Sequence, residues 1–157
     1  MNTNTKRFDR RQILKAAGGL GLVALGATLA PSMAFAAWNK AAFEAKTLSD
    51  VYSALGAGSP SNSSDVQIVA SDIAENGAVV PIQAVSKLAN TEQISILVEK
   101  NPSALAAQFF IPAGTDSFVT TRIKMGQTSN VYALVKADGK WNMAVKEVKV
   151  TLGGCGG

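Results

Sequence analysis

The chain lacks histidine altogether and holds a single cysteine among its 157 residues. Without histidine there is no Ser-His-Asp triad, no Cys-His pair and no histidine-ligated metal. A single cysteine cannot form a disulfide within the chain, and no C-x-x-C-H pattern offers a haem attachment. No G-x-x-x-x-G-K-[ST] pattern is present for nucleotide phosphates. We therefore expect no catalytic residues, no metal and no resident cofactor.

Charged residues are few and unevenly distributed. Residues 1–36 hold five of the 15 basic residues and one of the 11 acidic residues. The remaining residues, about 121, have ten of each sign, so the net charge of +4 belongs to the first 36 residues. Nucleic-acid binding needs a clustered basic surface, and the composition gives no support to such a partner. The remaining length is enough for one domain with its own core.

The first 36 residues have the three parts of an export signal. A basic segment, residues 1–12, is followed by an uncharged apolar run, residues 16–30. Ala34 and Ala36 then fit the A-x-A pattern of a cleavage site. The apolar run is shorter than the roughly 20 residues that a membrane span needs. We predict cleavage after Ala36 and no association with a membrane.

Residues 9–15, with the sequence DRRQILK, resemble the twin-arginine signal S/T-R-R-x-F-L-K. Arg10 and Arg11 supply the arginine pair, while Asp9 and Ile13 depart from the pattern. The alternative is an ordinary Sec signal that happens to contain paired arginines. We favour the twin-arginine route, which exports folded proteins to the periplasm, so a partner could be acquired before export.

The only cysteine, Cys155, stands at the opposite end of the chain between two pairs of glycines. These are Gly153, Gly154, Gly156 and Gly157. Glycine buries no side chain and has the most backbone freedom to lose. Residues 153–157 therefore predict a flexible arm that presents one thiol. Three trans peptide units from Leu152 place that thiol at most roughly 10 Å beyond the domain.

Residues 37–152 predict one domain, with a helix followed by strands. Asn39 is a candidate N-cap for a helix from about Lys40 to Leu55, with Gly56 at its end. The helix has one broad apolar face, which we expect to dock on the domain's own sheet rather than on a partner. A loop rich in Ser, Asn, Gly and Pro follows.

Seven segments with alternating apolar residues then predict strands. They are Val66–Ala74, Ala78–Val85, Gln93–Glu99, Ala104–Ile111, Ser117–Met125, Asn130–Ala137 and Lys140–Leu152. Asn76-Gly77 and Asp138-Gly139 indicate tight hairpins. In the last strand the apolar residues change from odd to even positions, which indicates either a bulge near Lys146 or a strand buried on both faces for half its length. The fold prediction is mainly β, an immunoglobulin-like antiparallel β-sandwich with an N-terminal helix and a flexible C-terminal arm.

Two segments carry a family resemblance. The C-terminal residues 150–157, VTLGGCGG, resemble the end of SoxY, the sulfur-carrier subunit of the periplasmic Sox thiosulfate-oxidation system. Residues 73–81, IAENGAVVP, also resemble an internal pattern of that family. The resemblance extends over most of the chain after the signal.

The resemblance implies that Cys155 is the covalent attachment point for sulfur species and that the chain is a carrier, not an enzyme. It implies a heterodimer with a SoxZ-like subunit. It also implies a c-type cytochrome complex (SoxAX-like) that couples thiosulfate to the cysteine, and a SoxB-like hydrolase that releases sulfate. In some organisms a SoxCD-like sulfur dehydrogenase then oxidises the remaining sulfur.

An alternative function follows from the odd cysteine alone. Cys155 could link two copies of an exported structural or adhesive β-domain through an intermolecular disulfide. A non-reducing gel distinguishes the two functions, because a stable dimer as the only cellular species favours the disulfide.

Overall fold

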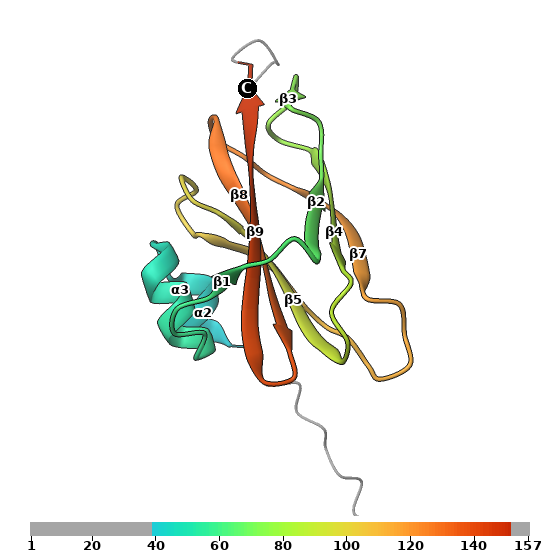
Figure 1. Ribbon diagram of the computed structural model, residues 1–157. Helices are drawn as coiled ribbons and strands as arrows, with labels where there is room; N and C mark the ends of the chain where they lie inside the picture. Colours follow the sequence, from blue (N-terminus) through green and yellow to red (C-terminus); the bar gives the residue numbers. More distant parts are fainter. Residues whose placement is uncertain (1–38, 152–157) are drawn as a thin grey trace, which may run out of the picture. The chain divides into compact units, whose positions relative to one another are not determined.

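The computed structural model describes residues 39–151 (Figure 1). Within this range two helices precede nine strands. The helices are α2 (Lys40–Glu44) and α3 (Leu48–Leu55). The strands are β1 (Ser61–Asn62), β2 (Val66–Val69), β3 (Ile73–Ala74), β4 (Val80–Ser86), β5 (Thr91–Val98), β6 (Leu105–Phe110), β7 (Phe118–Ile123), β8 (Ser129–Ala137) and β9 (Lys140–Val150). The predicted mainly β class is confirmed; the immunoglobulin-like type stays a prediction.

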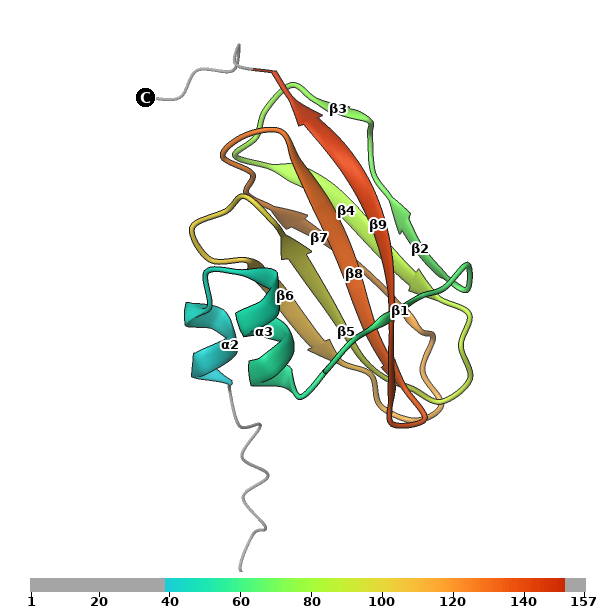
Figure 2. The same ribbon diagram turned by 60° about the vertical axis from the view of Figure 1, so that its left-hand side comes forward.

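The strands form two sheets. The larger has the order β1-β9-β8-β5-β6, with β3 also paired to β9, and the smaller has the order β2-β4-β7. Neighbouring strands are antiparallel, except that β1 and β3 run parallel to β9. The sheets face one another, and the two helices lie on the other face of the larger sheet (Figures 1 and 2).

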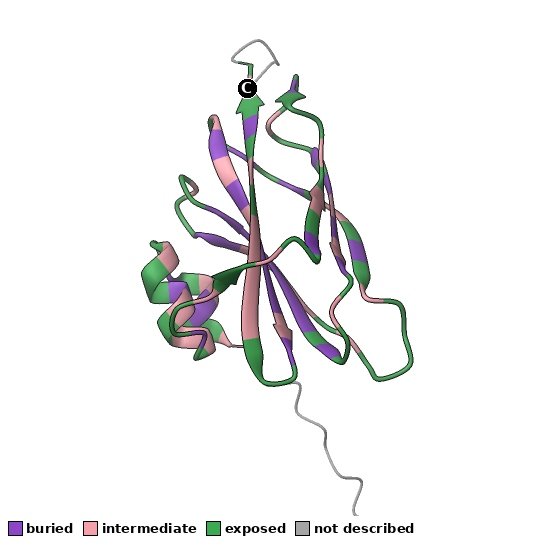
Figure 3. Ribbon diagram, in the orientation of Figure 1, coloured by how far each residue is buried: buried purple, intermediate pink, exposed green. Residues whose placement is uncertain are grey.

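The main core lies between the two sheets. Alternate residues of β4, β5 and β8 point into it, and Ile82, Ile96 and Val131 are each at most 1% exposed. On β8 this alternation appears as buried and intermediate bands (Figure 3). Burial of this apolar surface is the main favourable term in the stability of the domain.

A second cluster joins the helices to the outer face of the larger sheet. Val51 of α3 packs with Leu97 of β5 and Leu134 of β8, all at 0% exposure. The expectation that the apolar helical face docks on the domain's own sheet is therefore confirmed. Because β5 contributes to both clusters, it is buried along both faces.

The prediction of one continuous helix was wrong. Asn39 does cap the first helix, its side chain accepting a hydrogen bond from the amide of Ala42, but that helix ends at Glu44. Ala45 is extended, and its carbonyl accepts a bond from the amide of Ala104. Thr47 then caps α3 by accepting from the amide of Asp50. The pattern Thr-x-x-Asp is a helix-start signal that the sequence contained.

One predicted hairpin formed and the other did not. Asp138 and Gly139, with φ of 47° and 69°, join β8 to β9 as a tight turn. Asn76-Gly77 lies between β3 and β4, which are not paired with one another. β3 pairs with β9 instead. β2 still pairs with β4, but the chain makes an excursion to the larger sheet between them.

The predicted bulge in the last strand is also absent. β8 and β9 pair in continuous register from Ser129↔Val148 to Ala137↔Lys140. The odd residues Trp141 and Met143 face the helices, while Val148 faces the core between the sheets. The alternative of a strand that packs on both faces is therefore the correct one.

Candidate functional site

The site residues predicted from the sequence lie outside the described range. These are Cys155 with Gly153, Gly154, Gly156 and Gly157, the signal residues Arg10 and Arg11, and the cleavage residues Ala34 and Ala36. All of these assignments stay predictions. The structure does describe the segment from which the predicted arm continues, Lys149–Thr151, which we call the arm root.

The arm root overhangs its partner strand. The last pair between β8 and β9 is Ser129↔Val148, so β8 offers no backbone partner to Lys149, Val150 or Thr151. Unsupported residues at the end of a strand would expose unpaired amides and fray. In this chain other segments supply the missing partners.

Each of the three amides of the arm root donates a hydrogen bond. The amide of Lys149 donates to the carbonyl of Asp72 (2.9 Å), and that of Thr151 donates to the carbonyl of Ala74 (3.1 Å). On the opposite edge the amide of Val150 donates to the hydroxyl oxygen of Thr128 (3.0 Å). β3 can be followed beside the end of β9 in Figure 2. The arm root is therefore bonded on both edges.

The turn after β3 packs against the arm root at close range. A Cβ atom on Gly77 would lie 2.3 Å from the carbonyl oxygen of Met125 and 2.9 Å from a methyl group of Val150. The carbonyl of Gly77 accepts a hydrogen bond from the amide of Met125 (2.7 Å). Only glycine fits at this position without a shift of the backbone.

Lys146, in β9, contacts the segment that connects β2 to β3. Its ammonium donates to the carbonyl of Ala70 (2.6 Å) and pairs with the carboxylate of Asp72 (2.9 Å). The hydrogen bond and the positive charge of Lys146 hold the pKa of Asp72 below its ordinary value. Asp72 is almost fully exposed, so this ion pair contributes little energy by itself.

The internal segment 73–81 thus has a structural role that the sequence analysis missed. It was expected to form a hairpin, whereas it places Ala74 and Gly77 against the arm root. A glycine after asparagine is a common turn signal, so the sequence alone did not separate the two uses.

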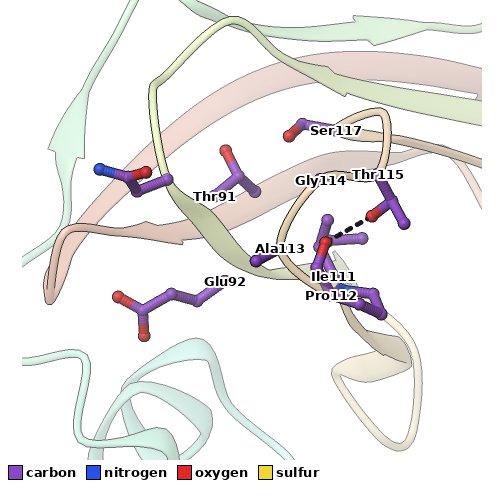
Figure 4. Close-up of a pocket in the computed structure, with 9 residues that line it drawn as sticks. Thr91, Glu92, Ile111, Pro112, Ala113, Gly114, Thr115 and Ser117 are labelled. Carbon is purple, nitrogen blue, oxygen red and sulfur yellow. Dashed lines mark hydrogen bonds between the residues drawn. The ribbon is translucent and has the colours of Figure 1, made fainter.

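A pocket of about 300 Å³ opens near the β8–β9 hairpin (Figure 4). It is lined by Asn90, Thr91, Glu92, Ile111, Pro112, Ala113, Gly114, Thr115 and Ser117. Thr91 pairs with Ala137 at the start of the hairpin, whereas the arm continues from the other end of β9. The 11 residues of β9 span about 36 Å. Four trans peptide units from Thr151 to Cys155 reach at most about 14 Å, so this pocket lies beyond the reach of the predicted arm.

Two polar side chains of this pocket, Glu92 and Thr115, form hydrogen bonds or ion pairs within the domain. Glu92 pairs with the ammonium of Lys136 (2.9 Å) and accepts a bond from the amide of Gly139. These contacts lower the pKa of Glu92. Thr115 donates to the carbonyl of Pro112, as the dashed line in Figure 4 shows.

Within residues 39–151 no group of three or more Asp, Glu, His and Cys side chains is placed to hold a metal ion. Neither described helix is long and apolar enough to cross a membrane.

The described residues form a mainly β domain with one long C-terminal strand, β9. Similarity to known proteins assigns the chain to a family. Residues 52–155 match the family described as sulfur oxidation protein SoxY. The chain therefore belongs to the SoxY family. The matched segment includes Cys155 and begins within α3, so α2 lies outside it.

A solved structure of the same family agrees with this assignment. The sulfur carrier protein SoxY from Chlorobium limicola f thiosulfatophilum is similar, with 37% identity and a TM-score of 0.58. The similarity covers 66% of this chain and 96% of that one. Superoxide reductase (neelaredoxin) from Ignicoccus hospitalis has 15% identity and a TM-score of 0.49, over 55% of this chain and 80% of that one, a likeness too low to inform function. A search of curated proteins gives no match.

Proposed function

We propose that this chain is a covalent sulfur carrier, in which Cys155 holds sulfur derived from thiosulfate and the glycine-rich arm presents it to partner enzymes. The observation that carries the proposal is the family match, which runs to residue 155 and so includes the sole cysteine. The relative from Chlorobium, at 37% identity, is itself described as a sulfur carrier protein.

The loading step forms one S–S bond between the thiol of Cys155 and the outer sulfur of thiosulfate. The thiol loses its proton, and two electrons pass to a c-type cytochrome of a SoxAX-like complex. The product is a cysteine S-thiosulfonate. Because the chain has no histidine to activate the thiol, the partner supplies the groups that promote this reaction.

The unloading step is a hydrolysis. In a SoxB-like hydrolase, water attacks the sulfonate sulfur, its bond to the neighbouring sulfur breaks, and sulfate leaves with the protons of the water shared between the products. Cys155 then carries a persulfide. A SoxCD-like sulfur dehydrogenase, in organisms that possess one, removes six electrons from the outer persulfide sulfur, which takes three oxygen atoms from water, and passes the electrons to a c-type cytochrome. Cys155 then carries a sulfonate. A second hydrolysis in the SoxB-like enzyme breaks the remaining S–S bond, releases sulfate and restores the free thiol. The carrier itself needs no cofactor besides the bound sulfur.

The glycines on either side of Cys155 suit this role. An arm little wider than a bare backbone can enter a narrow enzyme site, and ordering it costs about 1–2 kcal/mol per residue. This cost disfavours tight binding, which is appropriate for a carrier that must leave each enzyme. The proposed organisation is a signal in residues 1–36, an immunoglobulin-like sandwich in residues 37–152 and a flexible arm in residues 153–157.

The proposal also includes a location and a partner subunit. A twin-arginine signal would export the folded chain to the periplasm, together with a SoxZ-like subunit bound to it. Large apolar side chains on the described surface, such as Phe110 and Phe118, are 61% and 47% exposed. Part of a sheet or an edge strand of this domain is the expected binding face, since unpaired edges invite association.

The test replaces the chromosomal gene by one that encodes Cys155→Ser. We expect cells with this variant to stop producing sulfate from thiosulfate, while the amount of periplasmic protein and its unfolding temperature stay unchanged. A normal rate of sulfate production by the variant would refute the carrier function. A non-reducing gel of the wild type addresses the alternative: a disulfide-linked dimer as the only species would favour the structural role.

A further inference from the structure

We propose that residues 72–77, together with Thr128, act as a clamp that fixes where the carrier arm leaves the domain. This inference deepens the proposed function and rests on it. The clamp sets the free length of the arm. With the clamp in place, residues 152–155 link Cys155 to the domain, whereas release of the arm root would lengthen this link to residues 149–155. Its members are positioning residues, because they act on the thiol only through the arm root.

The overhang of β9 is the first observation. The ladder with β8 ends at Val148, yet the strand continues to Val150. The three amides beyond the ladder are bonded to Asp72, Thr128 and Ala74 at 2.9–3.1 Å. In one of these three bonds the acceptor is a side chain, the hydroxyl of Thr128. Thr128 directly precedes β8 and so lies beyond the last backbone pair of the ladder.

Packing is the second observation. Val150 packs against the core between the sheets, and Ala74 belongs to that core at 8% exposure. Gly77 approaches Val150 so closely that a single added carbon would overlap its surroundings. The clamp is therefore held by the core on one side and by hydrogen bonds along both edges of the strand.

The consequence for reach follows from chain geometry. With the clamp closed, the four peptide units that separate Thr151 from Cys155 extend at most about 14 Å. If the arm root were released back to Val148, seven residues would extend about 25 Å. The effective concentration of a tethered group falls roughly as the −3/2 power of the tether length, so the longer tether lowers it about twofold. A released arm also has more backbone entropy to lose on each docking.

The clamp offers two matched pairs of variants. Thr128→Val removes the oxygen that accepts from the amide of Val150 and keeps the size of the side chain, whereas Thr128→Ser keeps the oxygen. Gly77→Ala introduces the overlap with Met125 and Val150. Gly126→Ala, one residue from Met125, adds a carbon that meets nothing within 4 Å.

The experiment combines three measurements on full-length protein expressed in cells that lack the native gene. Amide hydrogen exchange reports the arm root, and the reaction of Cys155 with a small aromatic disulfide reports the thiol itself. The rate of sulfate formation from thiosulfate, divided by the amount of periplasmic carrier, reports use of the arm by the native enzymes. Thermal unfolding checks that each variant is folded.

For Thr128→Val and Gly77→Ala we expect exchange at residues 149–151 to rise at least tenfold. The rate of sulfate formation should fall two- to threefold, with an unchanged reaction of the thiol with the small disulfide. Thr128→Ser and Gly126→Ala should match the wild type in all three. Faster exchange with a normal rate of sulfate formation, or unchanged exchange in Thr128→Val, would overturn the clamp.

The proposed function has its own control in the same series. If Cys155→Ser still forms sulfate, the carrier function fails, whatever the exchange data show. If Cys155→Ser is inactive while Thr128→Val is fully active with a mobile arm root, the carrier function stands and the clamp is refuted. Should Gly77→Ala fail to fold, the two Thr128 variants still decide the question.

Discussion

Replacing Val51 by alanine tests whether the helices are an integral layer of the domain. Val51 is 0% exposed and belongs to the cluster that joins α3 to the outer face of the larger sheet. The change deletes two methyl groups, which costs about 1.6 kcal/mol at roughly 0.8 kcal/mol each. The small cavity left behind adds about 1 kcal/mol. We therefore expect the free energy of unfolding to fall by about 2.5 kcal/mol.

Urea denaturation of the purified chain measures this difference, and a thermal scan should show a midpoint lower by roughly 10 °C. Ser53→Ala is the matched control, because Ser53 lies on the exposed side of the same helix. Its effect should stay within about 0.5 kcal/mol. Cys155 should react with small thiol reagents at the same rate in both variants. A loss below about 0.5 kcal/mol in Val51→Ala would refute docking of the helix on the sheet.

Three further predictions concern the arm, the signal and pH. Gly154→Val and Gly156→Val should each react normally with small thiol reagents but fail as substrates of the partner enzymes, since a β-branched residue is wider and stiffer; equal turnover would rule out the narrow-site explanation. Replacing both Arg10 and Arg11 by lysine should block export, measured as loss of the periplasmic protein, whereas unchanged export would indicate the Sec route. The lowered pKa of Asp72 means that its ion pair stabilises the fold above the ordinary carboxyl pKa and is lost as the pH falls through the lowered value. The small stability difference between wild type and Asp72→Asn should accordingly be present above the ordinary carboxyl pKa and disappear as the pH falls through the lowered pKa of Asp72, and a difference that persists in stronger acid would contradict the assignment.

Local signals in the sequence predicted local structure well. Asp138-Gly139 formed a tight hairpin because the turn needs only two residues with positive φ, which this pair readily adopts. Asn39 capped the first helix as expected. The break at Ala45 depends on a hydrogen bond from Ala104, almost 60 residues away, so the periodicity of the helix alone could not reveal it.

Pairing between segments that lie far apart in the chain could not be predicted from the sequence. Asn76-Gly77 has the composition of a hairpin, but β3 finds a better partner in β9, which the chain reaches only after five more strands. The side chain of Thr128 meets the amide of Val150 across 22 residues, and no periodic pattern marks that contact. Cys155 was predicted from composition and position alone, whereas the residues that hold the arm root required the three-dimensional structure.

The carrier function is tested most directly by mass spectrometry of the chain from cells grown on thiosulfate. Trypsin cleaves after Lys149 and releases residues 150–157, a peptide with Cys155 as its only cysteine. We predict that this peptide carries an added S₂O₃ group or a single added sulfur, and that reduction removes both. The Cys155→Ser peptide should carry neither. An unmodified peptide from actively oxidising cells, or one found only as a disulfide-linked dimer, would contradict the proposal.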